Sequence, residues 1–580
     1  VIMNIVKQKI RGKTYVYIRE SFWDPVRKKY SSRNVKSYGN LEDLLKQNPH
    51  FLEDLEKEMA ALRSDRLSNK ERKVAELAKC VKMDVLRGSN AQADNRCTML
   101  GAYVIKRLWD KLALSRKLRD LQKTTNFSVD IPKAAFFMTA ARCLMPDSKL
   151  AQWKKRCQIL SGAQELKLQD LYRSLDFLQD HKEALLAYLN RKVSQAYQRE
   201  ITVALYDVTT YFFESQDADT LRNFGFSKDN KVNQVQVVMG LLIDQNGVPI
   251  DYELFPGNQN EFGTMLPILK KLKSRYRVKK LIVVADRGLN SASNLYELKE
   301  EQMDYVIAYR LRNAGCRIKK LIEDDAGWIH RRSDSLSDIA KFKLTDEARK
   351  VVIEENGEKR TVEIRSHLLI NYSAKRARKD RHDRERLIAK AQRLADHPAL
   401  LRSELKRGGR SFLNIRADGV SAEVDQAKIE SAEFWDGYYG IVYSDSTMTP
   451  EQVLSTHHSL WKIEESFRIA KSLLNARPCF HWKEKRIRGH FLICYLALTL
   501  HRLLELELAN CGEELSSERI FEALQGAMVT EIQLSPDEVV YAKSQTEGDF
   551  ATICRAVGLG EIPRISKETE LKAALKVKTL

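Results

Sequence analysis

Three acidic residues in this chain have the type and setting of a metal-dependent phosphodiester site. Asp207 ends an apolar, β-branched run that begins at Ile201, and Asp286 ends a continuous apolar run that begins at Leu281. A carboxylate at the end of a buried strand lies on the rim of a sheet, where ligands bind. Together with Glu464, the two aspartates can hold two divalent metal ions about 4 Å apart, the arrangement used for phosphodiester chemistry. The residues alone leave open the alternative that each aspartate is a turn residue or a helix cap.

The stretch Pro450–Leu474 predicts the helix that positions the glutamate. Thr449 suits the N-cap, Pro450 the first helical position, and Gln452 completes a capping-box spacing. At about 100° per residue, one stripe roughly 80° wide carries the side chains that can do chemistry: His457, Trp461, Glu464, Arg468 and Lys471. The neighbouring stripe is apolar: Leu460, Ile463, Phe467, Ala470 and Leu474. The alternative is a solvated face with ordinary ion pairs, such as Glu464 with Arg468.

The helical period also separates two adjacent carboxylates. Glu464 and Glu465 differ by about 100° around the helix axis, so both cannot face the same metal ions. Glu464 lies on the polar stripe, whereas Glu465 points beyond its edge, toward solvent or another domain. We therefore expect Glu464 to be the metal ligand.

Three short blocks around these acidic residues resemble a known family. YDVTT, VVADRG and WKIEESFRIAK are similar, in this order, to the signature blocks of DDE insertion-sequence transposases. The likeness is to the large, IS-four-like group, in which a β-rich insertion splits a ribonuclease-H-like core. The last block of that group reads Tyr, two residues, Arg, three residues, Glu, six residues, Lys. Glu464 and Lys471 match it, but His457 replaces the Tyr and Leu460 the Arg.

The resemblance implies a reaction and a cofactor. Water attacks a phosphodiester at the end of the element, and the freed 3′-OH then attacks target DNA. Asp207, Asp286 and Glu464 would coordinate two Mg²⁺ ions, with Mn²⁺ as a substitute, since Mg²⁺ prefers oxygen ligands. One alternative is a ribonuclease-H-like endonuclease without strand transfer. The other is a catalytically silent DNA-binding repressor, although three clustered carboxylates are costly without a metal.

The resemblance and the charge pattern also suggest residues that contact DNA. Lys471 and Arg468 would hold backbone phosphate near the metal ions. Trp435 lies where relatives place an aromatic that stacks on a displaced base, and its alternative role is a buried structural residue. The basic run 375–386 predicts a helix beside a DNA groove, with a solvated face as the alternative. The complete set of expected contacts is Lys471, Arg468, His457, Trp461, Trp435, Arg287, Lys375, Arg376 and Arg378.

Composition favours a polyanionic partner and excludes several other classes. The chain of 580 residues carries a formal charge of +20, a balance that favours nucleic acid. Its nine cysteines form no CxxC pair, so we expect reduced thiols rather than a disulfide framework or a zinc ribbon. No apolar run approaches about 20 residues, and the first residues have no signal-peptide pattern, which predicts neither membrane insertion nor secretion. We expect double-stranded DNA as the partner, a homodimer in the synaptic complex, and a location at the bacterial nucleoid in the cytoplasm.

The order of elements predicts a multi-domain α/β chain. From Asp207 onward the pattern reads strand, strand, strand, helix, strand, helix, strand, which is the ribonuclease-H order. The insertion that follows is expected to be β-rich, with strands at Ile318–Ile322 and Lys341–Leu344 and a hairpin from Val351 to Arg365.

The predicted domains follow from these patterns. Residues 1–40 form a small β-hairpin unit and residues 41–190 a helical region that binds the DNA end, with an ordinary helical bundle as the alternative. Residues 191–310 and 437–510 form the ribonuclease-H-like catalytic core. Residues 311–436 are the β-rich insertion with its basic helix, and residues 511–580 are a C-terminal domain.

Overall fold

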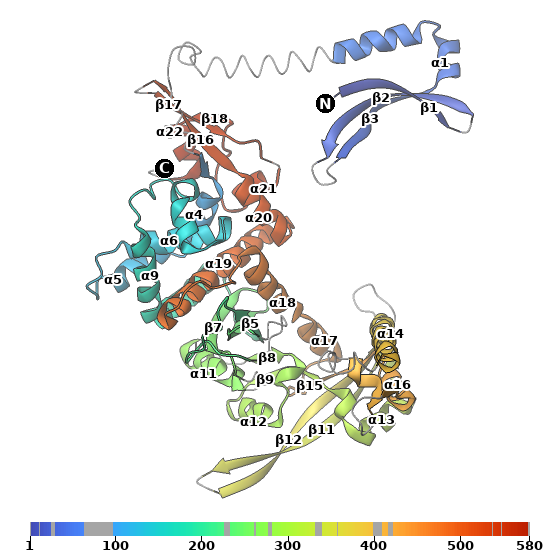
Figure 1. Ribbon diagram of the computed structural model, residues 1–580, viewed down its shortest axis with the longest axis vertical. Coiled ribbons are helices and arrows are strands. Elements are labelled where there is room, and N and C mark those ends of the chain that lie inside the picture. The colour runs from blue at the N-terminus through green and yellow to red at the C-terminus, as the bar shows by residue number, and fades with distance from the viewer. Residues whose placement is uncertain are drawn as a thin grey trace. The chain divides into compact units, whose positions relative to one another are not determined.

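The computed structural model describes the whole chain except residues 1, 11, 25–28, 63–96, 226–232, 260–262, 277–280, 331–338, 356–357, 398–408, 416–421, 536–537, 547 and 578–580. The chain divides into two compact units (Figure 1). The first comprises residues 1–95, 530–543 and 563–571, and the second comprises residues 96–529, 544–562 and 572–580.

A three-stranded antiparallel sheet begins the first unit. Strands β1 (Ile2–Ile10), β2 (Lys13–Asp24) and β3 (Lys29–Asn40) lie in that order. Helix α1 (Leu41–Gln47) follows and ends at Asn48, because the residue before a proline is biased away from helical geometry. A second helical stretch covers residues 51–62, and its Leu55 packs with Val16 and Ile18 into a small core. The two strands expected in this segment are present, and β1 is an additional one.

A nine-stranded sheet organises the second unit. Its ribonuclease-H-like half has the order β7-β6-β5-β8-β9. These strands are β5 (Val203–Phe212), β6 (Gln236–Asp244), β7 (Pro249–Pro256), β8 (Ile282–Ala285) and β9 (Asp304–Tyr309). β5 is antiparallel to β6 and parallel to β8, and β8 is parallel to β9. Helices α11 (Met265–Tyr276) and α12 (Ala292–Glu300) occupy the two crossovers, so the predicted element order is confirmed.

The inserted segment continues this sheet. Strand β12 (Glu358–Ser373) pairs with β15 (Tyr438–Tyr443), which pairs with β9. β11 (Ile339–Glu355) forms the predicted hairpin with β12, and β10 (Ile329–His330) lies at its edge. The tip of that hairpin, residues 356–357, lies outside the described residues. The hairpin extends far from the rest of the sheet (Figure 1).

One predicted strand of the insertion is wrong. Ile318–Ile322 lies in helix α13 (Gly315–Glu323). Ile318 and Ile322 are four residues apart and both are buried, whereas Lys319 and Lys320 between them are exposed. That spacing fits a helix that buries one face, and the short apolar segment hid the period. The predicted basic helix is present as α14 (Ala374–Asp396), followed by α16 (Gln426–Glu433).

Helix α19 (Glu484–Asn510) is the buried axis of the helical part of the second unit. It packs against α6 (Ile131–Leu144) and α9 (Leu168–Asp180). A Cβ added at Gly489 would lie only 2.3 Å from the carbonyl oxygen of Leu175, so this close approach of α19 to α9 requires glycine. No helix in the described part of the chain has the length and apolar composition to cross a membrane.

Further helices and strands complete the described part of the chain. The remaining helices are α4 (Gly101–Lys111), α5 (Leu114–Gln122), α7 (Lys149–Lys154), α8 (Arg156–Ile159), α10 (Lys182–Tyr197), α17 (Pro450–His458), α18 (Trp461–Arg468), α20 (Ser517–Gly526), α21 (Gly548–Ala556) and α22 (Glu568–Leu575). The remaining strands are β4 (Cys97–Met99), β13 (Leu413–Ile415), β14 (Ala422–Val424), β16 (Met528–Ser535), β17 (Glu538–Lys543) and β18 (Ile565–Lys567). No disulfide joins the cysteines within the described ranges.

Candidate active site

The three predicted carboxylates line one cavity of the second unit. Asp207, Asp286 and Glu464 all border a space of about 310 Å³ at the edge of the sheet. β5 and β8 are parallel neighbours whose register pairs Tyr206 with Ala285. The residue after each member of that pair is an aspartate, so the two carboxylates come from adjacent positions of adjacent strands.

Asp207 does not end its strand as expected. β5 continues to Phe212 because residues 207–212 keep their pairing with β6, whereas β8 stops at Ala285. Asp207 therefore lies where β5 outlasts its parallel neighbour. This position still opens onto the sheet edge, because β8 no longer covers that side of β5.

Local hydrogen bonds orient both aspartates. Oδ1 of Asp207 accepts from the backbone N–H of Val208 at 2.7 Å. Oδ1 of Asp286 accepts from the N–H of Arg287 at 2.7 Å, and Asp286 is the N-cap of the short 3-10 turn Arg287–Leu289. Asp286 is therefore a helix cap, as the alternative interpretation predicted, and it also borders the cavity.

The glutamate lies on a helix that is broken, where the sequence predicted a continuous one. α17 has the predicted capping box, in which Thr449 Oγ1 accepts from the N–H of Gln452 at 3.3 Å and Gln452 Oε1 accepts from the N–H of Thr449 at 2.9 Å. The helix then ends, and α18 begins at Trp461. Between them the hydroxyl of Ser459 donates to the carbonyl of Thr456 at 2.6 Å, a local bond that competes with helix continuation. Directly after α18, the backbone forms a wider, π-helical turn at Ile469–Leu473.

The break separates the predicted polar stripe into two groups. His457, Trp461 and Glu464 line the cavity with the aspartates. Arg468 instead forms ion pairs with Glu518 and with Glu465, the latter at 3.4 Å, and is not among the residues that border the cavity. Lys471 also lies outside this lining, and its Nζ is 5.6 Å from the ring centroid of Tyr211.

Glu465 belongs to a partly buried ionic cluster on the other side of α18. Its Oε2 accepts from Arg502 Nη1 at 3.0 Å. Arg502, on α19, also donates to Glu505 at 2.6 Å, to the carbonyl of Lys462 at 3.1 Å and to Ser466 Oγ at 2.9 Å. One buried guanidinium therefore ties α18 to α19 and fixes the face that α18 presents to the cavity.

His457 occupies the position next to Asp286. Its Nε2 is inaccessible to solvent and has no hydrogen-bond partner among the described residues. Burial lowers the pKa of His457 to about 4, although the nearby Asp286 carboxylate opposes this shift. The imidazole is therefore neutral at physiological pH and presents a polar atom without a partner at the edge of the cavity.

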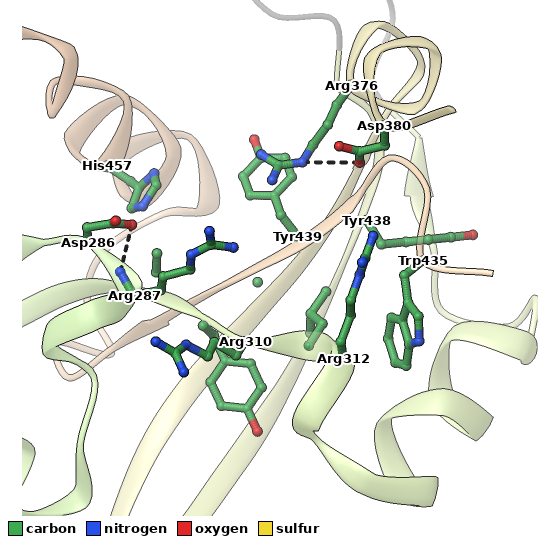
Figure 2. Close-up of a pocket in the computed structure, with 14 residues that line it drawn as sticks. Asp286, Arg287, Arg310, Arg312, Arg376, Asp380, Trp435, Tyr438, Tyr439 and His457 are labelled. Carbon is green, nitrogen blue, oxygen red and sulfur yellow. Dashed lines mark hydrogen bonds and ion pairs between the residues drawn. The ribbon is translucent and has the colours of Figure 1, made fainter. Parts of the chain in front are cut away.

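A second cavity of about 630 Å³ adjoins the first and is lined by arginines and aromatic rings (Figure 2). The two cavities share Asp286, Arg376, Tyr439 and His457. The arginines of the second cavity are Arg287, Arg310, Arg312 and Arg376, and its aromatic residues are Tyr309, Trp435, Tyr438 and Tyr439. Cationic groups therefore accumulate directly beside the carboxylates.

Two of these arginines were not identified from the sequence. Arg310 and Arg312 follow the end of β9, just as Asp286 and Arg287 follow the end of β8. Because β8 and β9 are parallel neighbours, the residues after both strands meet at one edge of the sheet. The signal in the sequence is the position after a strand, which Arg310 and Arg312 share with Asp286.

The insertion contributes Arg376 and Trp435 to this second cavity. The guanidinium of Arg376 lies 4.9 Å from the ring centroid of Tyr439 and its Nε lies 3.6 Å from Asp380 Oδ2. The ring of Trp435 packs edge-on against Phe434 at 5.0 Å and also borders the cavity, so it combines a structural contact with a position at the site. Lys375 and Arg378 are exposed on α14 and border neither cavity.

The chemistry of the donors fits a divalent cation. Three carboxylates around one cavity offer the oxygen ligands that Mg²⁺ prefers. Within the described ranges, no three acidic, histidine or cysteine side chains are already close enough together to hold a metal ion. The carboxylates would therefore have to turn toward the ion on binding, which is feasible because Asp286 and Glu464 are exposed.

A family model described as a transposase DDE domain matches residues 201–500. No curated protein matches the chain. Among solved structures, a piggyBac transposase synaptic complex with hairpin DNA, determined by cryo-EM, is similar over 76% of this chain and 81% of that one, with 8% sequence identity and a TM-score of 0.34.

Proposed function

The chain belongs to the family of transposases with a DDE domain, whose activity is DNA cleavage and strand transfer, and we propose that Asp207, Asp286 and Glu464 are its catalytic triad. The observation that carries this assignment is that one cavity gathers all three. They come from separate sequence blocks spread over 258 positions of the chain, between residues 207 and 464.

Divalent metal ions are general in this family, and we propose Mg²⁺ as the ion here. Two such ions bound by the triad would activate the attacking oxygen and stabilise the leaving one. The three ligands come from different kinds of secondary structure. Asp207 lies on β5 and Asp286 directly follows the neighbouring strand β8, whereas Glu464 lies on α18, which Arg502 holds from the opposite side.

The arginine-lined cavity is the proposed path of the DNA backbone beside the triad. Arg287, Arg310, Arg312 and Arg376 would neutralise phosphates there, and Trp435 would stack on a base. His457 and Trp461 would contact DNA from the helical side of the first cavity. Arg468 and Lys471 would reach phosphate only beyond the cavity lining, and Arg468 would first have to leave Glu518.

We further propose that two copies of the chain act together. Two ends of an element must be brought to one target, and each copy supplies a single triad. A homodimer assembled on DNA is the smallest arrangement that meets this need.

A strand-transfer assay tests the proposal. The substrate is pre-cleaved duplex DNA carrying the inverted repeat that flanks the gene, together with a supercoiled target plasmid. Wild-type protein should join the 3′ end to the plasmid in Mg²⁺ or Mn²⁺, and Asp207→Asn should abolish joining while it retains DNA binding. Full activity in EDTA would refute the metal site, and cleavage without joining would identify a nuclease.

A further inference from the structure

The first 62 residues are divided into a basic and an acidic layer. Residues 1–40, which contain the three strands, have ten Lys and Arg against two acidic residues. Residues 41–62, which contain the helices packed on the sheet, have two Lys against six acidic residues. The strands therefore carry a formal charge of +8 and the helical layer −4. The sheet layer of this module is therefore the part whose net charge suits a polyanion.

The helices cover only one face of the sheet. On β2, Val16 and Ile18 point into the small core with Leu55. Because side chains alternate along a strand, Tyr15, Tyr17 and Arg19 point to the opposite face, and all three are half-exposed. Figure 1 shows the helical segment after β3 lying along one side of the sheet.

Polar side chains surround this open face. In the antiparallel register, Asn4 and Asn34 flank Arg19, Gln8 lies opposite Tyr15, and Ser37 lies opposite Tyr17. These four flanking residues are exposed. On the covered face, by contrast, basic side chains already have acidic partners, Arg33 with Glu20 at 2.8 Å and Lys36 with Glu58 at 2.6 Å.

Hydrogen bonds across the strands orient Arg19. Its Nε donates to Asn34 Oδ1 at 2.9 Å, and its Nη2 donates to Gln8 Oε1 at 3.0 Å. These two bonds engage two of the five N–H groups of a guanidinium. Arg19 is thus positioned in a row with two amides at the centre of the open face.

We propose that this open face, defined by Tyr15, Tyr17 and Arg19 with Gln8 and Asn34, reads duplex DNA in the major groove. The major groove admits β-strands as well as a helix. Arg pairs with guanine O6 and N7, and Asn and Gln pair with adenine N6 and N7, so the side chains present are those that read bases. The exposed Lys13, which lies on the same face of β2 as Tyr15, is placed to contact a flanking phosphate.

This proposal takes its partner from the proposed function but is independent of the triad. It places sequence recognition in the sheet of the first unit. The sequence pattern had instead favoured the helical region 41–190 for binding the DNA end. Binding can therefore be measured without catalysis.

The test uses the full-length chain in EDTA, so that no DNA is cut. Wild-type protein first enriches duplexes from a pool with a randomised segment, and the enriched duplex and a scrambled duplex then serve as probes in fluorescence anisotropy. Arg19→Ala should lose at least about tenfold in affinity for the enriched duplex but less than about threefold for the scrambled one. Arg19→Lys keeps the charge and loses the planar fork, so it should resemble Arg19→Ala on the enriched duplex and wild type on the scrambled one.

Lys57→Ala is the matched control, since Lys57 is an exposed cation on the helical layer. It should bind both probes as wild type does. Thermal unfolding of each variant checks the fold, and methylation of guanine N7 in the enriched duplex should interfere with wild-type binding.

Three results would overturn the proposal. The first is failure to enrich any duplex sequence. The second is wild-type affinity of Arg19→Ala for the enriched duplex, which would place base recognition elsewhere. The third is tighter binding of single-stranded DNA or RNA of the same sequence. A chain that shows the Arg19 effect and yet performs no strand transfer would contradict the proposed function alone.

Discussion

Two adjacent glutamates on α18 have opposite surroundings. Glu464 is exposed at the cavity that holds both aspartates. Glu465 is paired with Arg502 at 3.0 Å and Arg468 at 3.4 Å. The first is placed for chemistry and the second holds the helix, so their replacement should have different consequences.

Glu464→Gln should abolish cleavage, a loss of at least about a hundredfold, while folding and DNA binding stay nearly intact. The variant keeps the size of the side chain and removes the charge that a metal ion needs. Glu465→Gln should retain most activity and lose about 1–2 kcal/mol of stability, because a charge-assisted bond to Arg502 becomes a neutral one. Cleavage assays and urea unfolding of both variants measure this. The reverse ranking in activity would show that the proposed active site is wrong.

The ionic cluster behind α18 has a pH dependence of its own. Burial raises the pKa of Glu505, but His501, Arg502 and Ser517 outweigh that effect and lower it to about 2. His501 Nε2 lies 3.2 Å from Glu505 Oε1 without forming a well-aligned hydrogen bond, whereas Arg502 Nη1 donates to Glu505 Oε2 at 2.6 Å. A folded-state pKa below the usual 4.5 means that the carboxylate stabilises the fold at neutral pH.

That stabilisation should be present above about pH 4.5 and disappear as the pH falls toward about 2. At about 1.4 kcal/mol per pKa unit, its size is at most roughly 3.5 kcal/mol. Glu505→Gln should therefore be less stable than wild type at pH 7, and the difference should shrink between pH 5 and pH 3 in urea unfolding. Glu514→Gln, on the exposed loop before α20, is the control and should follow wild type. A difference between Glu505→Gln and wild type that stays constant with pH would contradict this role.

At the scale of elements, unequal strand lengths and one inserted helix shape the site. β8 ends at Ala285 while β5 continues to Phe212, and this mismatch opens the sheet edge at Asp207. α14 begins at the end of β12, where Ser373 Oγ accepts from the N–H of Arg376 at 3.2 Å. The cap starts the helix so that Arg376 borders both cavities.

Arg376→Ala should therefore reduce DNA cleavage by roughly tenfold or more, since a cation beside the reacting phosphate is lost. Arg378→Ala, two residues along α14 and exposed, removes the same charge away from both cavities. It should change cleavage less than about threefold. Turnover on a duplex substrate at saturating metal compares the two variants. Equal losses would mean that α14 acts through its total charge.

At the scale of the whole molecule, charge and chain architecture favour a nucleic-acid partner. The formal net charge is +20. In the second unit, the inserted hairpin adds strands to the catalytic sheet, and helices α6 and α9 pack on α19. Residues 96–190 share a compact unit with the catalytic sheet, so a truncation that tests the role of the first segment should begin at residue 96.

Affinity for any duplex should fall steeply with salt. A chain that neutralises six to ten phosphates loses about 10³ to 10⁵ in affinity between 50 and 200 mM salt. Anisotropy titrations of a scrambled duplex at several salt concentrations give the slope, and Arg287→Ala should reduce it by about one. An affinity unchanged across this range would argue against phosphate contacts.

The sequence by itself determined the three acidic blocks, the ribonuclease-H order of strands and the capping box at Thr449. These features are local or periodic: a buried strand needs a continuous apolar run, and a cap needs two residues three positions apart. The same local information separated Glu464 from Glu465, because the helical period alone sets their angle.

The tertiary structure decided what depends on neighbours. That β5 outlasts β8 follows from its continued pairing with β6, a separate segment of the chain. Arg468 does not border the cavity with the rest of the predicted stripe, because it pairs with the carboxylate of Glu518, 50 positions away. Arg310 and Arg312 joined the site only because β9 lies parallel to β8. Such contacts cost chain entropy to form and are selected by the whole fold, so no spacing in the sequence encodes them.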